Sequence, residues 1–369
     1  MQSDQWSTAV GLHGGAAGPY SKRGTGGEGG PGGRATPPSV RRGLQWLAAH
    51  QDDDGRWDAD GFMKHDDPAL ATCDGPGNAV HDVGCTALAL LAFLGENNTT
   101  KSGVYRENVR RGVSWLRKQQ DPETGLFGAR LSHDFVYDHA IAAYAMCEAY
   151  GLSRSKVLEK PAQRGLDYLE SHRNAYSVWR YQPQDQDNDI SVTGWAIMAY
   201  EAGRFFGLQV NRTALDNAEV FLEQVSDASG RHGYQLAGQP SSRKPGAHGV
   251  RFPAAKSNAL TAVGLFCRFF LGQDPDERPV MRAAARLLAQ SPPSWNEASG
   301  EIDHYGWYYA TYALFQMGGP AWRSWRRAIE AAVPGNQHQD RTAANLYGSW
   351  DPVGAWGEDG GRAQRTRGV

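Results

Sequence analysis

The chain has 369 residues and a formal net charge of -2, so it lacks the basic field that nucleic-acid binding requires, and that class of function is excluded. Its 40% hydrophobic and 21% charged residues permit a sizeable core and exclude wholesale disorder. The longest apolar runs are far shorter than the ~20 residues of a membrane-spanning helix. We therefore expect a soluble, cytoplasmic protein without a transmembrane segment, and we leave peripheral association with a membrane open.

Composition divides the chain into three parts. Residues 1–38 are rich in Gly, Ser, Thr and Pro and contain few apolar side chains, which predicts a flexible tail. Residues 39–350 contain a recurring unit and are expected to form one repeat domain. Residues 351–369 include Gly360-Gly361-Arg362 and end in a polar stretch, so we expect an irregular C-terminal tail.

The recurring unit is an amphipathic helix, a turn with glycine and an aromatic residue, and a second, mostly apolar helix. In its clearest copy, Arg42-Gly43 and Trp46-Leu47 precede Gln51, Gly55 and Trp57. About six copies follow one another and become more degenerate toward the C-terminus. The apolar helices, expected to be buried on most sides, lie at about residues 80–95, 137–151, 189–207, 256–272 and 303–318. This alternation predicts an all-α protein, an α/α toroid with an outer and an inner ring of helices.

The first copy matches every position of the QW motif of squalene and oxidosqualene cyclases. The chain therefore resembles the prenyltransferase/squalene oxidase repeat family, the toroid superfamily of terpenoid cyclases and protein prenyltransferases. The resemblance covers roughly residues 40–318 and implies the same fold. Since lanthipeptide cyclases and thioester domains share that fold, the resemblance does not fix a reaction. A toroid of six units also needs an inner helix after the sixth turn at Trp350, and from the short polar remainder we expect this closing helix to be missing.

The strongest acidic pattern is Asp187-Asn-Asp189-Ile190-Ser191. It resembles the Asp-x-Asp-Asp-Thr motif of class II terpenoid cyclases, in which the middle acid protonates an alkene or epoxide; here Ile190 replaces the third acid. The resemblance implies that Asp189 is the proton donor and that Asp187 assists, because a neighbouring carboxylate helps to keep an acid protonated. Capping of the following helix explains the same residues as well, and this alternative stays open.

Aromatic side chains on the inner helices can stabilise a carbocation or simply fill the core. The candidates for substrate binding are Trp195, Phe266, Phe270, Trp307 and Tyr308.

No cofactor motif is present, and zinc is a weak possibility only. Related prenyltransferases and lanthipeptide cyclases hold zinc at the toroid rim, and here His81, His139 and His304 lie at comparable starts of inner helices. The four cysteines are widely spaced without a CxxC pair, so we expect reduced, buried thiols.

Two functions remain. The first is a terpenoid cyclase-like or prenyltransferase-like enzyme acting on an apolar isoprenoid or lipid substrate by acid-initiated cyclisation. The second is a non-catalytic toroid that binds a protein or lipid ligand. Whether Asp187 and Asp189 face an enclosed apolar interior or bulk water distinguishes the two.

Overall fold

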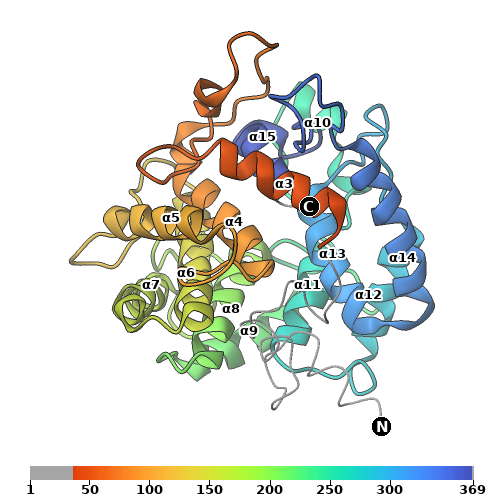
Figure 1. The fold of residues 1–369 in the computed structure, drawn as a ribbon. Helices are drawn as coiled ribbons and strands as arrows, with labels where there is room; N and C mark the ends of the chain where they lie inside the picture. The colour runs from red at the N-terminus through yellow and green to blue at the C-terminus, as the bar shows by residue number, and fades with distance from the viewer. Residues whose placement is uncertain (1–35, 368–369) are drawn as a thin grey trace.

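The structure, a computed structural model, describes residues 36–367, so residues 1–35 of the expected N-terminal tail lie outside the described range. Within this range the regular elements are helices. Strand-like pairing is limited to two isolated bridges, Gln120 to Phe127 and Ser226 to His232. The long helices follow one another round a ring (Figure 1). The predicted all-α toroid is therefore confirmed.

Outer and inner helices alternate along the chain. The outer helices are α3 (Pro38–Ala49), α5 (Arg106–Gln119), α7 (Glu159–His172), α9 (Arg212–Gln224), α12 (Pro279–Gln290) and α14 (Gly319–Ala332). The inner helices are α4 (Asp82–Gly95), α6 (Phe135–Ser153), α8 (Ile190–Phe205), α11 (Ala259–Phe270), α13 (His304–Met317) and α15 (Gly357–Arg367). Short helices in the connections are η1 (Phe62–His65), η2 (Ala79–His81), η3 (Lys156–Leu158), α10 (Ala247–Arg251), η4 (Ala254–Lys256) and η5 (Pro334–Asn336).

Burial separates the two rings as the residue pattern predicts. Every residue of α8 from Ile190 to Gly203 is buried, so this helix has no solvent face. On α5 the buried residues form a single stripe, which is typical of a helix with one side in water: Val109, Gly112, Val113, Trp115 and Leu116. The inner helices pack against one another in chain order, α4 on α6, α6 on α8, α8 on α11 and α11 on α13.

The expectation that the closing inner helix is missing is wrong. Helix α15 fills the sixth inner position and packs against α3 and α4, so that the last described helix lies beside the first (Figure 1). The sequence concealed this helix because Gly361 interrupts it with a positive φ of 59°. At that kink the backbone passes so close to Gly77 that a Cβ atom on Gly361 would lie 2.4 Å from the Gly77 nitrogen.

Residues 357–367 form a helix and are not the irregular tail that the sequence predicted. Arg362 holds this helix in place. The side chain is only 1% exposed. Its guanidinium donates to the Ser349 hydroxyl (3.0 Å), to Asp351 Oδ1 (2.7 Å) and to the Asp74 carbonyl (3.1 Å). A buried arginine with this many acceptors is stable because each lost water contact is replaced.

In the first and second turns, a glutamine side chain connects the turn to the next outer helix. Gln51 donates to the Gly55 carbonyl (2.8 Å) and to the Asn108 carbonyl at the start of α5 (3.0 Å). Its own oxygen accepts from Arg111 (2.8 Å). In the second turn, Gln120 donates in the same way to Gly125 and to Pro161 of α7 (3.1 and 3.0 Å).

The sixth turn repeats this arrangement and connects to the first helix, which closes the ring. Gln337 donates to the Gly348 carbonyl (2.8 Å) and to the Ser39 carbonyl (2.9 Å), and its oxygen accepts from Arg42 (2.9 Å). The sequence hid this glutamine because a longer loop separates it from Gly348 than separates Gln51 from Gly55.

The tryptophan of the turn satisfies the exposed end of its own outer helix. The indole N–H groups of Trp57, Trp179 and Trp350 donate to the carbonyls at the ends of α3, α7 and α14. These bonds are 2.7 to 2.8 Å long, and all three rings are at most 1% exposed. Each aromatic side chain therefore fills the space between two rings of helices while it pairs one of the carbonyls that a helix leaves free.

Among the described residues, no helix is long and apolar enough to cross a membrane.

Gly348→Ala tests the role of the turn glycine in closing the ring. Gly348 has a φ of +95°, and a Cβ atom there would lie 2.3 Å from the Arg42 carbonyl oxygen. We expect a loss of at least about 2 kcal/mol in the free energy of unfolding, measured with urea, because strain and displacement of α3 add. The control is Gly335→Ala, whose Cβ meets nothing within 4 Å. Equal losses in both variants would contradict the account.

Candidate functional site

Asp189 begins the inner helix α8 and is fully buried, with 0% of its surface exposed. Its Oδ1 accepts the N–H groups of Ser191 and Val192, each at 2.8 Å, and thereby caps the helix. Its own N–H donates to the carbonyl of Trp179 in the third turn (3.1 Å). The third turn and the helix start therefore fix the position of this carboxyl group together.

The second oxygen, Oδ2, faces side chains of the third and fourth turns. The Tyr234 hydroxyl donates to it at 3.3 Å, and Arg180 Nε lies 3.8 Å away. Tyr234 is held in place because its carbonyl accepts the Ile190 N–H (3.0 Å). Its hydroxyl also forms a hydrogen bond with the hydroxyl of Tyr181. Oδ2 is thus the oxygen of Asp189 that is not committed to the helix.

Burial raises the pKa of Asp189 to about 7. The capping N–H groups, Arg180 and Tyr234 all favour the carboxylate and hold the pKa below the value that burial alone would give. Near neutral pH a substantial fraction of the molecules therefore carries a proton on this carboxyl group, which an ordinary aspartate would have lost.

Four phenols surround Asp189, and we call Tyr137, Tyr181, Tyr234 and Tyr305 the tyrosine cluster. Burial raises the pKa of each phenol, and the charge of Asp189 raises it further. The phenols therefore stay protonated at neutral pH and can donate hydrogen bonds. Asp189 thus lies in an aromatic interior with hydroxyl donors and away from bulk water.

Asp187 lies in a different environment. Its side chain is 56% exposed, and it pairs with Arg180 and accepts a hydrogen bond from Gln235 (2.9 Å). Arg180 contacts both acids and lies between them. The structure therefore does not bring the two carboxylates together as a pair that shares a proton, and the raised pKa of Asp189 comes from burial.

Four of the five aromatic candidates form one cluster between α8, α11 and α13. Trp195 stacks near Tyr308, with ring centroids 6.2 Å apart, and Phe266 lies 4.3 Å from Phe270. Tyr309 contacts both Trp195 (5.8 Å) and Phe266 (5.1 Å) and joins the two pairs.

The aromatic cluster continues to the acid through Tyr305. Its ring centroid lies 5.0 Å from that of Tyr309, and its phenol is in the tyrosine cluster around Asp189. The fifth candidate, Trp307, lies elsewhere, against Trp295 of the fifth turn (6.5 Å) and His304 (5.0 Å). Trp307 therefore packs between rings of helices and does not belong to the cluster near Asp189.

The histidines at the helix starts have separate partners. His81 Nδ1 lies 3.0 Å from Asp138 Oδ2; burial opposes protonation, but this carboxylate outweighs it and raises the pKa of His81. His139 accepts the Phe127 N–H (3.0 Å) and donates to the Gly165 carbonyl (3.1 Å), so both ring nitrogens are engaged. Burial lowers its pKa to about 3. His139 is therefore neutral and connects the second turn to α7 through its two hydrogen bonds.

The remaining acids at the rim are also engaged. Asp303 caps α13 through the Gly306 N–H (3.0 Å) and accepts from Ser257 (2.8 Å). Asp82 accepts the Ala59 N–H (2.8 Å), and burial raises its pKa to about 6. The capping interpretation is therefore correct for Asp303 and Asp189, while Asp82 holds the first turn.

Metal donors gather elsewhere than at these histidines. Among the described residues, sets of three donors within 4.8 Å of one another are His50, Asp66 and Cys73, and Asp58, Asp60 and Asp82. Neither set includes His81, His139 or His304.

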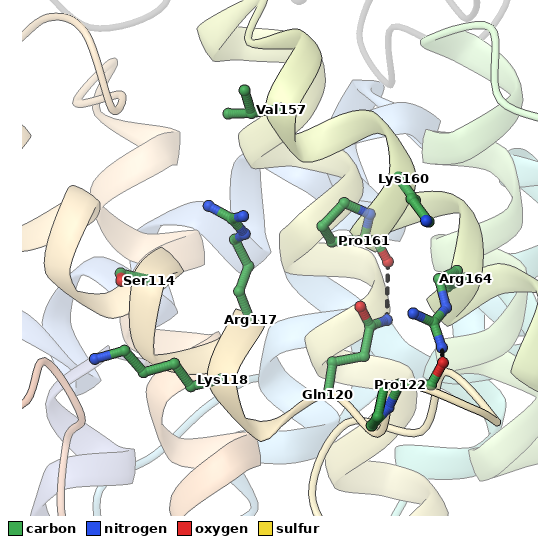
Figure 2. Close-up of a pocket in the computed structure, with 9 residues that line it drawn as sticks. All are labelled: Ser114, Arg117, Lys118, Gln120, Pro122, Val157, Lys160, Pro161 and Arg164. Atoms are coloured by element: carbon green, nitrogen blue, oxygen red, sulfur yellow. Dashed lines mark hydrogen bonds between the residues drawn. The ribbon is translucent and has the colours of Figure 1, made fainter.

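An external groove of about 540 Å³ lies between α5 and α7, and Asp189 is not among the residues that line it. Figure 2 shows its floor, where Gln120 bonds to the Pro161 carbonyl and Arg164 to the Pro122 carbonyl. The lining residues are Ser114, Arg117, Lys118, Gln120, Pro122, Val157, Lys160, Pro161 and Arg164. Because this lining has no acid, the groove offers no proton donor of the predicted kind.

No protein-family model matches the chain. Among curated proteins, the squalene–hopene cyclase of Bradyrhizobium diazoefficiens is 26% identical over 188 residues, which are 44% of this chain and 26% of that enzyme. The chain therefore spans about a quarter of the length of this relative.

Two solved structures indicate how far the similarity of fold extends. A variant of the type II terpene cyclase MstE from Scytonema, in complex with its product merosterolic acid A, is 13% identical with a TM-score of 0.53, covering 90% of this chain and 94% of that one. The cellobiose 2-epimerase of Spirochaeta thermophila is 13% identical with a TM-score of 0.55, covering 89% and 92%. At such identities the likeness shows the fold alone. It confirms the predicted α/α toroid.

Sequence reasoning identified Asp189 but missed the residues that set its chemistry. Arg180, Tyr137, Tyr181 and Tyr305 carry no motif, and Tyr234 was recognised only as a turn aromatic. Their proximity depends on how the third and fourth turns and two inner helices converge. A repeat pattern alone does not specify it.

Asp189→Asn should have a pH-dependent effect on stability. A raised pKa means that the folded state binds the proton more tightly than the unfolded state, whose pKa is near 3.8. The wild type therefore loses stability as pH rises from about 4 to about 7, by up to about 1.4 kcal/mol per pH unit, and the uncharged Asn does not. Urea unfolding of both proteins across this range should show that the free energy of unfolding of the variant, relative to that of the wild type, increases as pH rises. A difference that stays constant with pH would refute the raised pKa.

Proposed function

We propose that this toroid catalyses the acid-initiated cyclisation of an isoprenoid substrate, with Asp189 as the proton donor. The observation that carries the proposal is a fully buried carboxyl group with a pKa of about 7, whose Oδ2 is not used to cap the helix. Similarity to a squalene–hopene cyclase supports it. The fold shared with MstE supports it as well. One MstE variant, whose structure is in complex with its substrate geranylgeranyl dihydroxybenzoate, matches this chain with a TM-score of 0.50.

In the proposed reaction, the proton on Asp189 Oδ2 passes to a substrate alkene, and the alkene becomes a carbocation. The carboxylate left behind is stabilised by the Ser191 and Val192 N–H groups, by the Tyr234 hydroxyl and by Arg180. Since these donors are in place before the reaction, little reorganisation is needed when the charge develops.

The aromatic cluster is suited to the cation that follows. The ring centroid of Tyr309 lies 5.8 Å from that of Trp195 and 5.1 Å from that of Phe266, and the π faces of these rings can attract positive charge. The apolar side chains around them also keep water away from the cation. The cation ends by losing a proton or by adding water.

The hydroxyls of Tyr234 and Tyr181 offer a route by which Asp189 regains its proton. Tyr181 is half-buried and bonds to Tyr234, which in turn bonds to Asp189. A proton can pass along this chain when each hydroxyl accepts one proton and donates its own. In this scheme Asp187 acts only by holding Arg180 and takes no part in proton transfer.

Asp189→Asn should abolish most of the activity. Purified protein is incubated with squalene and with linear prenyl diphosphates, and products are separated by gas chromatography with mass spectrometry. Because the amide has no proton to give, we expect turnover to fall by about 10²- to 10⁴-fold. Asp187→Asn is the matched control and should retain activity within a few-fold. No turnover by the wild type with any isoprenoid, or full activity of Asp189→Asn, would reject the proposal.

The pH profile supplies a separate test through Tyr234→Phe. The acid must be protonated, so wild-type activity should fall as pH rises through about 7. The Tyr234 hydrogen bond favours the carboxylate, and its loss should raise the pKa of Asp189 and move this fall to higher pH. A fall that stays at the same pH, or moves to lower pH, would contradict the assignment.

A second candidate is a non-catalytic toroid that binds a protein or lipid ligand. The observation in its favour is that Asp189 has a complete structural role as the cap of α8, with Arg180 as a nearby counter-charge. Under this alternative the wild type binds an isoprenoid without converting it, and Asp189→Asn leaves that binding unchanged.

A further inference from the structure

A second group of chemically active side chains lies in the connection between α3 and α4. His50 follows the last residue of α3, Asp66 follows the short helix η1, and Cys73 lies in the loop beyond it. Their donor atoms all lie within 4.8 Å of one another. The side chains of His50 and Asp66 are 5% and 4% exposed, and Cys73 is 4% exposed. Three buried groups with lone pairs therefore meet at one point.

The hydrogen bonds of His50 leave a lone pair on its Nε2 facing a lone pair on an oxygen of Asp66. His50 Nδ1 lies 2.8 Å from the Trp46 carbonyl oxygen, which can only accept, so Nδ1 carries the proton. In a neutral imidazole Nε2 then has a lone pair, and it faces Asp66 Oδ1 at 3.3 Å. These two lone pairs are compensated either by a proton shared between His50 and Asp66 or by a bound cation.

The atom types of the three donors indicate which metal ion would bind here. Nitrogen, oxygen and sulfur together suit zinc, whereas calcium and magnesium prefer oxygen alone. In a tetrahedral zinc site with bonds of about 2.0–2.3 Å, neighbouring ligand atoms lie about 3.3–3.8 Å apart. The Nε2 to Oδ1 distance of 3.3 Å falls in that range.

We propose that His50, Asp66 and Cys73 bind a zinc ion, with a water molecule at the fourth position. Binding replaces the thiol proton of Cys73, which is released to solvent, and no oxidation or reduction takes place.

The surroundings of His50 are those of a metal ligand. Metal-binding histidines usually donate their other ring N–H to a carbonyl or carboxylate, as His50 does to Trp46. The Trp46 ring also stacks on the imidazole, with centroids 4.0 Å apart and planes at 17°. Nε2 is therefore oriented before any ion arrives, which lowers the entropy lost on binding.

The site lies where the sixth repeat meets the first. Asn345, in the loop of the sixth turn, donates to the carbonyls of Asp67 (3.1 Å) and Ala71 (2.9 Å), and its own carbonyl accepts from the protonated Cys73 thiol (2.9 Å). Zinc binding would replace this last hydrogen bond with a zinc–sulfur bond. A metal ion held by His50 and Cys73 would fix the loop against which Asn345 packs. Zinc thus stabilises the closed ring and takes no part in chemistry at Asp189.

Cobalt substitution tests the proposal on the intact protein. The full-length chain is stripped of metal with a chelator and titrated with Co²⁺, then with Zn²⁺. We expect one ion per chain, intense visible bands of tetrahedral cobalt and a near-ultraviolet charge-transfer band from thiolate. Zinc should displace the cobalt and raise the thermal unfolding temperature. Because the other cysteines are buried in helices, the thiolate band identifies Cys73 in the wild type, even if a variant fails to fold.

The variants locate the ligands. Cys73→Ser should lose the thiolate band, and both Cys73→Ser and His50→Gln should bind zinc at least about 100-fold more weakly, as expected when a ligand is lost. The matched controls, Cys147→Ala and His65→Gln, should bind as the wild type does. The absence of a tetrahedral cobalt spectrum in the wild type would overturn the proposal, because His50 and Asp66 would then form a buried ion pair. Undiminished zinc affinity in Cys73→Ser would overturn it as well.

Discussion

In three of the turns, one glutamine side chain holds neighbouring repeats together, and closure of the ring depends on this contact. Gln51, Gln120 and Gln337 each donate to the glycine carbonyl of their own turn and to a carbonyl of the next outer helix. A pair of such bonds contributes about 1–3 kcal/mol net. Their larger effect is geometric, because each turn fixes the angle between successive repeats. The bond from Gln337 to Ser39 extends this geometry across the ends of the chain and closes the ring.

Packing of the inner helices creates the environment of Asp189. Helix α8 is buried on every side from Ile190 to Gly203 because neighbouring helices pack around it, and its N-cap residue, Asp189, is removed from water as well. Removal from water, and not a neighbouring carboxylate, raises the pKa of Asp189. The chain thus reaches a neutral acid by a different physical route from the one that the acidic motif implied. Asp187 can be exposed without changing that result.

The fold was predictable from the sequence, whereas the site was predictable only in part. The repeat unit reports on local packing, so five inner helices were placed correctly. The closing helix was missed because its kink at Gly361 and its buried Arg362 do not look like an inner helix. Asp189 was found through its motif. The phenols around it come from four separate segments, and the His50, Asp66 and Cys73 cluster has no regular spacing, so both depend on tertiary contacts that a single sequence does not display.

If burial governs this site, the carboxyl group of Asp189 keeps its proton up to about pH 7. The most direct measurement is the carboxyl ¹³C chemical shift of the protein labelled at aspartate, followed over pH, with Asp189→Asn used to assign the resonance. One resonance, absent in the variant, should titrate near pH 7, as the raised pKa requires. A resonance for Asp189 that titrates near the ordinary aspartate value, about 3.9, would contradict the account and favour the role of Asp189 as a helix cap alone.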